Sequence, residues 1–212
     1  MIAGQRRPHL PRSQIERMWQ SFHTLVSGPL AAANIPLAVT PGNHDGSAYR
    51  GFESERAIYA EQWNARRPVL EFIDQTGYPF HYAFTSGDTL FVSLDATTTG
   101  HLPAEQTAWL EDLLEQHGPS FRRRVVFTHL PLWPFAQGRE REYIGDPALQ
   151  RILGNTEVDL FISGHHHAFY PGSKGGVVHL GQPCLGAGPR RLLGAADASP
   201  RAFSLIEFGD AA

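Results

Sequence analysis

Cysteine is nearly absent from this chain, since Cys184 is the only one among 212 residues. A single cysteine excludes an internal disulfide and any zinc site built from several cysteines. Histidine, by contrast, is plentiful, with 11 residues. A metal in this protein would therefore be held by histidine, asparagine or carboxylate side chains.

The sequence also lacks an excess of one charge and any long apolar run. Lys and Arg number 18 against 21 Asp and Glu, so the net charge is -3. Bulk electrostatics therefore indicate no nucleic-acid or membrane partner, and an anionic substrate would need a local site. Without a bilayer-spanning run or a signal-peptide pattern, the displayed chain is expected to be soluble and cytoplasmic. The compartment stays open because a longer N-terminus could carry a signal peptide, and the oligomeric state is unspecified.

The pattern of apolar residues predicts one α/β domain with a sizeable core. Ser13 and Glu16 match a capping box at the start of the first helix. Helical spacing predicts helices over 13–26, over 53–75 with a break before residue 68, over 103–118 and over 147–153. Short apolar runs predict strands over 37–40, 80–84, 90–94, 124–128, 158–162, 177–180 and 203–208.

Potential metal ligands follow three of these predicted strands. Asn43 and His44 follow the first, His129 follows the second, and His165 and His167 follow the third. Because sites in α/β folds gather beyond the carboxyl ends of strands, these side chains are expected to converge. Neutral nitrogen and amide-oxygen ligands suit zinc, iron, manganese or nickel.

The local sequence favours this convergence. Side chains two residues apart face the same way in an extended segment, so His165 and His167 are expected to share one site. His166 then points elsewhere, either to a position behind the ligands or, more simply, to the surface. Gly42 and Gly164 would let the backbone pass close to a metal.

A single histidine is more often a loop residue or a hydrogen-bonded core group than a ligand. His81 is expected to meet solvent or a polar neighbour. The same structural interpretation applies to His9, His23, His101, His117 and His179.

Three motifs together, "PGNHD", "FTHLPLW" and "ISGHHH", resemble the calcineurin-like metallophosphoesterase superfamily in order and spacing. The resemblance covers roughly residues 37–170, and "LDATTTG" at 94–100 is similar to bacterial members. It implies a four-layer α/β/β/α sandwich with mixed sheets. It also implies metal-dependent hydrolysis of a small phosphoester, by a phosphatase or a phosphodiesterase in its full-length form.

The resemblance assigns roles residue by residue. Asn43, His129 and His165 match ligands of one metal, and His167 matches a ligand of a neighbouring metal. His44 matches the group that stabilises the transition state or protonates the leaving oxygen, and Asp45 matches the partner that orients His44. The cofactors implied are divalent or trivalent Mn, Fe, Zn or Ni, two of them in a full-length form.

One departure from the superfamily pattern is plain. The pattern opens with an Asp-x-His block and a Gly-Asp block, and neither precedes Pro41 in this sequence. "MIAGQ" at residues 1–5 fits the segment that follows the second block. Residues 1–212 are therefore expected to be a single N-terminally truncated domain that lacks the first strand and holds one metal or none.

Three alternatives to an enzyme with two metals stay open. The chain is either a catalytically impaired remnant that binds a single metal or an anion, a fragment that folds only with a partner segment, or a hydrolase with one metal and an open coordination position. Four arginines lie where they could meet phosphate, although solvated loop charge is the simpler interpretation: Arg139, Arg141, Arg190 and Arg191.

Overall fold

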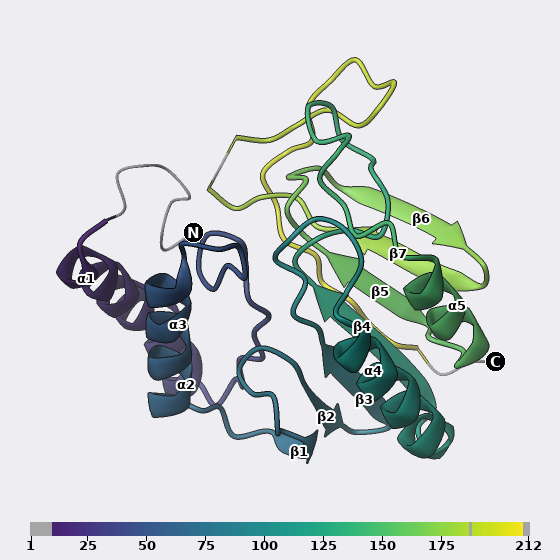
Figure 1. Cartoon of the computed structure of the whole chain (residues 1–212), viewed down its shortest axis with the longest axis horizontal. Helices are drawn as coiled ribbons and strands as arrows, with labels where there is room; N and C mark the ends of the chain where they lie inside the picture. Colours follow the sequence, from purple (N-terminus) through teal and green to yellow (C-terminus); the bar gives the residue numbers. More distant parts are fainter. Residues whose placement is uncertain (1–9, 187, 210–212) are drawn as a thin grey trace.

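The computed structural model describes residues 10–186 and 188–209 of the chain. Its strands form one mixed sheet in the order β1-β2-β3-β4-β5-β7-β6 (Figure 1). The strands are β1 (Glu71–Asp74), β2 (Tyr82–Ser86), β3 (Thr89–Ser93), β4 (Arg123–Thr128), β5 (Leu160–Ser163), β6 (Tyr170–Lys174) and β7 (Val177–Gly181). The four central strands β3, β4, β5 and β7 run parallel, and antiparallel pairs complete both edges.

Helices cover both faces of this sheet. They are α1 (Arg12–Phe22), the π-helix η1 (His23–Ser27), α2 (Gly28–Ala32), α3 (Glu53–Ala65), α4 (Ala104–His117), the 3-10 helix η2 (Gly118–Ser120) and α5 (Pro147–Asn155). In Figure 1, α4 and α5 lie together over one face of the central strands, and α1 and α3 lie side by side at the other end of the molecule. Among the described residues, none of the helices combines the length and apolar character needed to cross a membrane.

Alternating side chains divide the interior into two cores. Ala83 and Val92 pack with α4 and α5, whereas Tyr82 and Phe84 pack with Trp19 of α1 and with residues of α3. This is the alternation that strands covered on both faces require. The predicted α/β class with a mixed sheet is confirmed, although the described strands lie in one sheet where the four-layer sandwich leads us to expect two.

The start of the first helix differs from its prediction. Pro11 occupies the N-cap position of α1, without a side-chain capping hydrogen bond. Glu16 instead pairs with Arg12 at 2.7 Å. The predicted capping box of Ser13 and Glu16 is therefore wrong, because the helix begins one residue before Ser13 and a nearby cation binds the carboxylate.

The predicted helix over 53–75 is correct only for its first part. It ends at Ala65, three residues before Pro68, whose ring is incompatible with a helix interior. Residues 71–74 then form β1, in which Phe72 lies opposite Phe84 of β2. The Phe72 ring packs against Tyr78 and Tyr82, and this aromatic packing favours a strand in this short segment.

Two predicted strands do not form. The backbone of Val39, within residues 37–40, exchanges hydrogen bonds of 2.7 and 2.5 Å with the Tyr82 hydroxyl in place of a strand ladder. In the C-terminal segment, Arg123 donates to the Gly209 carbonyl and lies over the Phe208 ring, without strand pairing at 203–208. The edge strand β6 was not predicted, because its sequence "YPGSK" lacks the apolar alternation that marks a strand.

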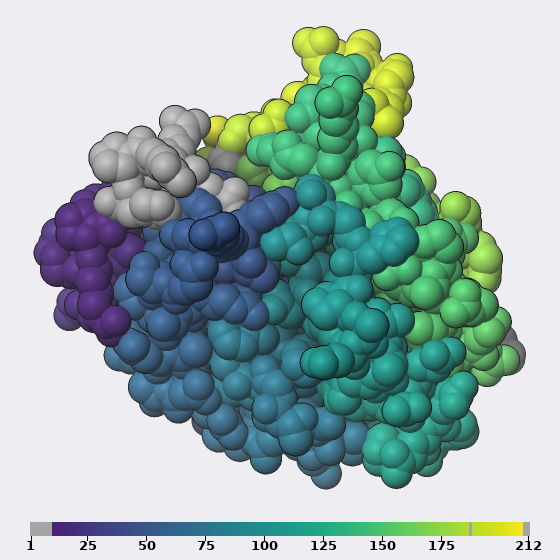
Figure 2. All heavy atoms as spheres, in the orientation of Figure 1, coloured from purple at the N-terminus to yellow at the C-terminus, as the bar shows by residue number. Residues whose placement is uncertain are grey.

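Two long loops stand together beyond the carboxyl ends of the central strands (Figures 1 and 2). One follows β4 and the other follows β7, and they are joined by an isolated bridge between Ala136 and Leu192. The Gln137 amide also donates to the Arg191 carbonyl at 2.9 Å. These loops form part of the surroundings of the strand-end histidines.

Candidate metal centre

The loop that carries Asn43, His44 and Asp45 is a tight turn. The amides of Asp45 and Gly46 both donate to the Gly42 carbonyl, at 3.0 and 2.9 Å. A Cβ added at Gly42 would lie 2.6 Å from an Asp45 carboxylate oxygen and 3.5 Å from His129 Nδ1. Glycine is therefore needed here for close packing of the turn.

Arg56 of α3 ties this turn to the end of β3. Its Nη1 donates to the Gly46 carbonyl at 2.6 Å, and its Nη2 forms an ion pair with Asp95. The guanidinium also lies 3.7 Å from the Phe80 ring centroid. Arg56 thus fixes the Asn43 loop relative to the sheet through a partly buried charge.

His129 follows β4 and lies at the middle of the cluster. Its Nε2 is 2.8 Å from Asn43 Oδ1 and 3.0 Å from His165 Nδ1. Three potential donor atoms thus meet at one point. Ligand atoms bound at about 2.1 Å lie about 3 Å apart in octahedral and about 3.4 Å apart in tetrahedral coordination, so these separations are close to those around a shared metal ion.

His165 reaches this point through an unusual backbone. Its φ is 60° and that of His167 is 53°, both in the left-handed region that side chains other than glycine rarely adopt. Both residues line one cavity, as predicted, but the segment between them is not extended as the prediction assumed. Such backbone strain is concentrated at functional sites.

Glu142 completes the surroundings of His165, and the sequence analysis missed it. Its carboxylate lies 2.6 Å from His165 Nε2 and also pairs with Arg139. Because a carboxylate can only accept, His165 donates its Nε2–H and leaves the Nδ1 lone pair facing His129. A carboxylate behind the ring is the usual arrangement for metal-ligating histidines.

The electrostatics keep both central imidazoles neutral. Burial, followed by the nearby His165 and His44, holds the pKa of His129 well below its ordinary value. Burial lowers the pKa of His165 to about 4, although Glu142 opposes this. Burial alone would raise the pKa of Glu142, but hydrogen bonds from Arg139 and His165 bring it below its ordinary value. The result is a pair of neutral rings beside an ionised carboxylate, the protonation state that metal binding requires.

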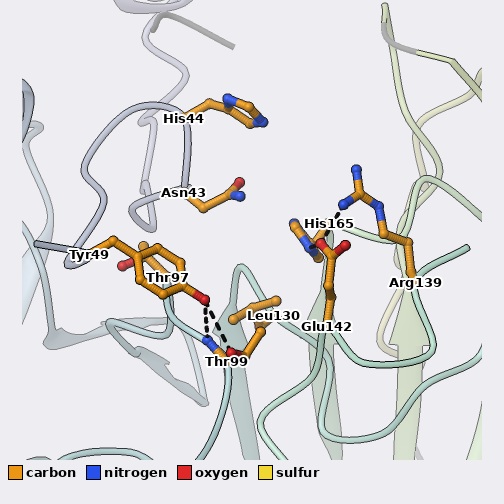
Figure 3. Close-up of a pocket in the computed structure, with 9 residues that line it drawn as sticks. All are labelled: Asn43, His44, Tyr49, Thr97, Thr99, Leu130, Arg139, Glu142 and His165. Carbon is orange, nitrogen blue, oxygen red and sulfur yellow. Dashed lines mark hydrogen bonds and ion pairs between the residues drawn. The ribbon is translucent and has the colours of Figure 1, made fainter. Parts of the chain in front are cut away.

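His44 and Asn43 project from their loop across a cavity of about 460 Å³ toward His165, Glu142 and Arg139 (Figure 3). The cavity wall near Asn43 includes Tyr49, Thr97, Thr99 and Leu130, and the Tyr49 hydroxyl bonds with Thr99. An adjoining cavity of about 950 Å³ includes Asp45, His129 and His167 in its lining. All six predicted site residues therefore surround one connected region.

His166 corrects one expectation. It is fully buried rather than at the surface. Its Nε2 bonds with the Glu142 carbonyl at 2.9 Å, and its ring packs against Phe135. His166 thus supports the loop that carries Glu142.

The other described histidines fit the interpretation that they are loop or core residues and not metal ligands. His23 bonds with Ser27 at 2.7 Å, and His179 is buried between Trp133 and Phe161. His81 contacts the Trp109 ring, and it is also partly exposed and near the carboxylates of Asp95 and Asp74, as expected for a group that meets solvent or polar neighbours. His101 is exposed and His117 is half-buried, and His9 lies outside the described residues.

The donors that meet beside His129 include few charged or histidine ligands. Across residues 10–186 and 188–209, no three His, Cys, Asp or Glu side chains group as a metal site. The amide oxygen of Asn43 supplies the third donor beside His129 and His165. His167 has its Nδ1 3.2 Å from the Gly188 carbonyl.

Fold and site together define an α/β protein with histidines clustered at the ends of parallel strands. The sequence model of the calcineurin-like phosphoesterase family matches residues 10–169, and the chain belongs to this family. The resemblance inferred from the three motifs is thereby confirmed.

One curated protein and two solved structures are similar to parts of this chain. Purple acid phosphatase 22 of Arabidopsis thaliana is 30% identical over 158 residues, which are 72% of this chain and 34% of that protein. The chain thus spans about a third of this curated relative. A dimetal phosphatase from Danio rerio has a similar fold, with a TM-score of 0.56 and 18% identity over 79% of this chain and 67% of that one. Purple acid phosphatase PPD1 from yellow lupin, Lupinus luteus, gives a TM-score of 0.49 and 19% identity over 80% of this chain and 32% of that one.

Proposed function

We propose that this protein hydrolyses phosphoester bonds of small substrates with a metal held by Asn43, His129 and His165. The observation that carries the proposal is that two further donor atoms, Asn43 Oδ1 and His165 Nδ1, lie within 3.0 Å of His129 Nε2. Membership of a phosphoesterase family supports the reaction class.

The metal bound there would polarise the phosphoryl oxygen and lower the pKa of a water molecule. The chain's own residues have separate tasks. His129 and His165 stay neutral through burial, so their lone pairs are available. The Glu142 carboxylate accepts a hydrogen bond from the Nε2–H of His165, which fixes the direction in which Nδ1 of that ring points. Zinc, iron, manganese or nickel suits this combination of imidazole and amide donors.

His44 is the proposed acid. It lies in the lining of both cavities, beside Asn43 but outside the central donor cluster. From this position it protonates the leaving oxygen or stabilises the transition state, and Asp45, in the same turn, orients it.

We further propose one tightly held metal for each chain. A second metal would need ligands in addition to His167. Among the described residues, no two further His, Cys, Asp or Glu side chains group with His167 as a metal site. A second candidate function follows from the same observation, namely binding of one metal or anion without turnover. The neutral donor set favours it, because a carboxylate is absent from the three donors that meet at His129.

Hydrolysis of p-nitrophenyl phosphate and bis-p-nitrophenyl phosphate, with each metal added in turn, tests these proposals. The wild-type chain should hydrolyse at least one ester, His129→Ala should lose at least a hundredfold in turnover, and the exposed-histidine control His101→Ala should match wild type. Metal binding without hydrolysis of either ester would favour the second candidate. Equal activity in His129→Ala and wild type would contradict the assigned site.

A further inference from the structure

Arg190 lies beside the candidate metal centre and is held there by its backbone. Its amide donates to the His167 carbonyl at 3.0 Å, and its carbonyl accepts from Ser199 at 2.9 Å. Its Nη1 lies close to Gly138, where an added Cβ would be only 3.5 Å away. The loop that carries Arg190 is therefore fixed to the segment that carries the site histidines.

The charge of Arg190 is not neutralised by any neighbour in the part of the chain that the structure describes. Within residues 10–186 and 188–209 its guanidinium has no ion pair, and its Nε is buried without a hydrogen-bond partner. Arg139, the other arginine of this lining, also has an unpartnered buried Nε, but its charge differs because Nη1 is paired with Glu142. Keeping a partly buried cation unpaired costs free energy, which a bound anion would recover.

Arg190 faces the substrate side of the centre. It lines the cavity of about 950 Å³ that also includes Asn43, His44 and His129. Asp45 is the only acidic side chain among the described residues of this lining. Beyond the metal ligands, the cavity thus has room and an available cation for a group larger than one phosphate.

We propose that Arg190 forms an anion subsite and that the substrate is a phosphomonoester with a second anionic group, a phosphate or a carboxylate. The substrate class rests on the proposed function, whereas the subsite itself does not require turnover. The planar guanidinium donates two parallel N–H bonds to such a group, which a point charge cannot do. The phosphoryl group being hydrolysed stays with Asn43, His129 and His165.

A matched pair of substrates tests the proposal in the metal-loaded protein. Phenyl phosphate and 4-carboxyphenyl phosphate differ by one carboxylate. Wild type should show a kcat/KM at least tenfold higher for the carboxylated ester, mainly through a lower KM, because a hydrogen bond to a charged group contributes at least this factor. Arg190→Gln should remove this preference, Arg190→Lys should keep part of it, and the exposed neighbour Arg191→Gln should keep all of it.

Binding measurements separate this proposal from the hydrolytic one. Phosphonoacetate and methylphosphonate contain no ester bond, and calorimetry gives their Kd whether or not the protein turns over. The expected result is about tenfold tighter binding of phosphonoacetate to wild type and equal binding of both to Arg190→Gln. This result without any hydrolysis would keep the subsite and refute the proposed activity. Equal weakening of both analogues in Arg190→Gln would overturn the proposal, because Arg190 would then bind their shared phosphoryl group.

Discussion

His165 lies between Glu142 and His129, with Nε2 2.6 Å from the carboxylate and Nδ1 3.0 Å from the second imidazole. The carboxylate fixes which nitrogen carries the proton and which presents a lone pair. Glu142 and His129 both lie in the loop between β4 and α5, and they are thus coupled through the ring of His165, which follows β5. The predictions below start from this relationship.

Glu142→Gln should weaken metal binding about tenfold to a hundredfold, because the amide holds the His165 ring less firmly and lowers its basicity. Competition with a chromophoric chelator measures this affinity. Glu140→Gln is the matched control, since Glu140 is exposed and its carboxylate accepts from the Gly138 amide at 2.9 Å. Equal affinities for wild type and Glu142→Gln would show that the carboxylate does not act on the metal.

His44→Ala should retain metal but lose turnover in a way that depends on the leaving group. General-acid catalysis contributes about a hundredfold to ten-thousandfold, and a poor leaving group needs it most. An alkyl phosphate should therefore lose far more kcat than p-nitrophenyl phosphate. Equal losses on both esters, or loss of metal, would contradict the role assigned to His44.

Arg56→Met should lower stability by about 1.5–3 kcal/mol, the range for a hydrogen bond to a charged group. The variant loses both the contact with the Gly46 carbonyl and the ion pair with Asp95. Urea unfolding gives the free energy, and Arg17→Met, which removes an exposed arginine from α1, is the control. A double-mutant cycle with Asp95→Asn should give a coupling energy above zero, and additive losses would rule out the tether.

The stability of the fold should fall in acid through His179. Burial, with Lys174 nearby, lowers the pKa of His179 from 6.5 to about 4. The unfolded chain therefore binds the proton first, so stability is fully present above the unfolded pKa and is lost as pH falls from 6.5 to about 4. The loss is of the order of 3 kcal/mol.

Urea titrations across this pH range compare wild type with His179→Gln, which cannot titrate. The other buried histidines contribute to both proteins, so the difference between the two curves isolates His179. A smaller pH slope in His179→Gln supports the account. Parallel curves would mean that His179 is protonated equally in the folded and unfolded states.

Much of the fold was predictable because local patterns and the final structure agree. The hairpin of β2 and β3 and the helix α4 follow from alternation and helical spacing within a few residues of their predicted bounds. The segment 37–40 was not predictable in this way, since its backbone bonds with Tyr82, a residue distant in sequence. Three interpretations stay predictions. They are that a first strand is missing, that the two missing motif blocks reflect a truncated domain, and that the protein is of the bacterial type.

The site was predictable where ligands directly follow strands. His129 and His165 come after β4 and β5, which pair in parallel and so bring both residues to one edge. Glu142 escaped because it lies on an irregular loop without periodicity, and its role depends on contacts with Arg139 and His165. The only sequence signal for this role was weak. It consisted of Arg139 and Glu142, three residues apart in a loop between two predicted elements.

Metal content after extensive dialysis tests the central claim most directly. Elemental analysis of wild type, His165→Ala and the exposed-histidine control His101→Ala compares the site with an unrelated histidine. The account predicts about one transition metal for each wild-type and control chain, and almost none in His165→Ala. Two tightly held metals in wild type, or unchanged content in His165→Ala, would contradict it.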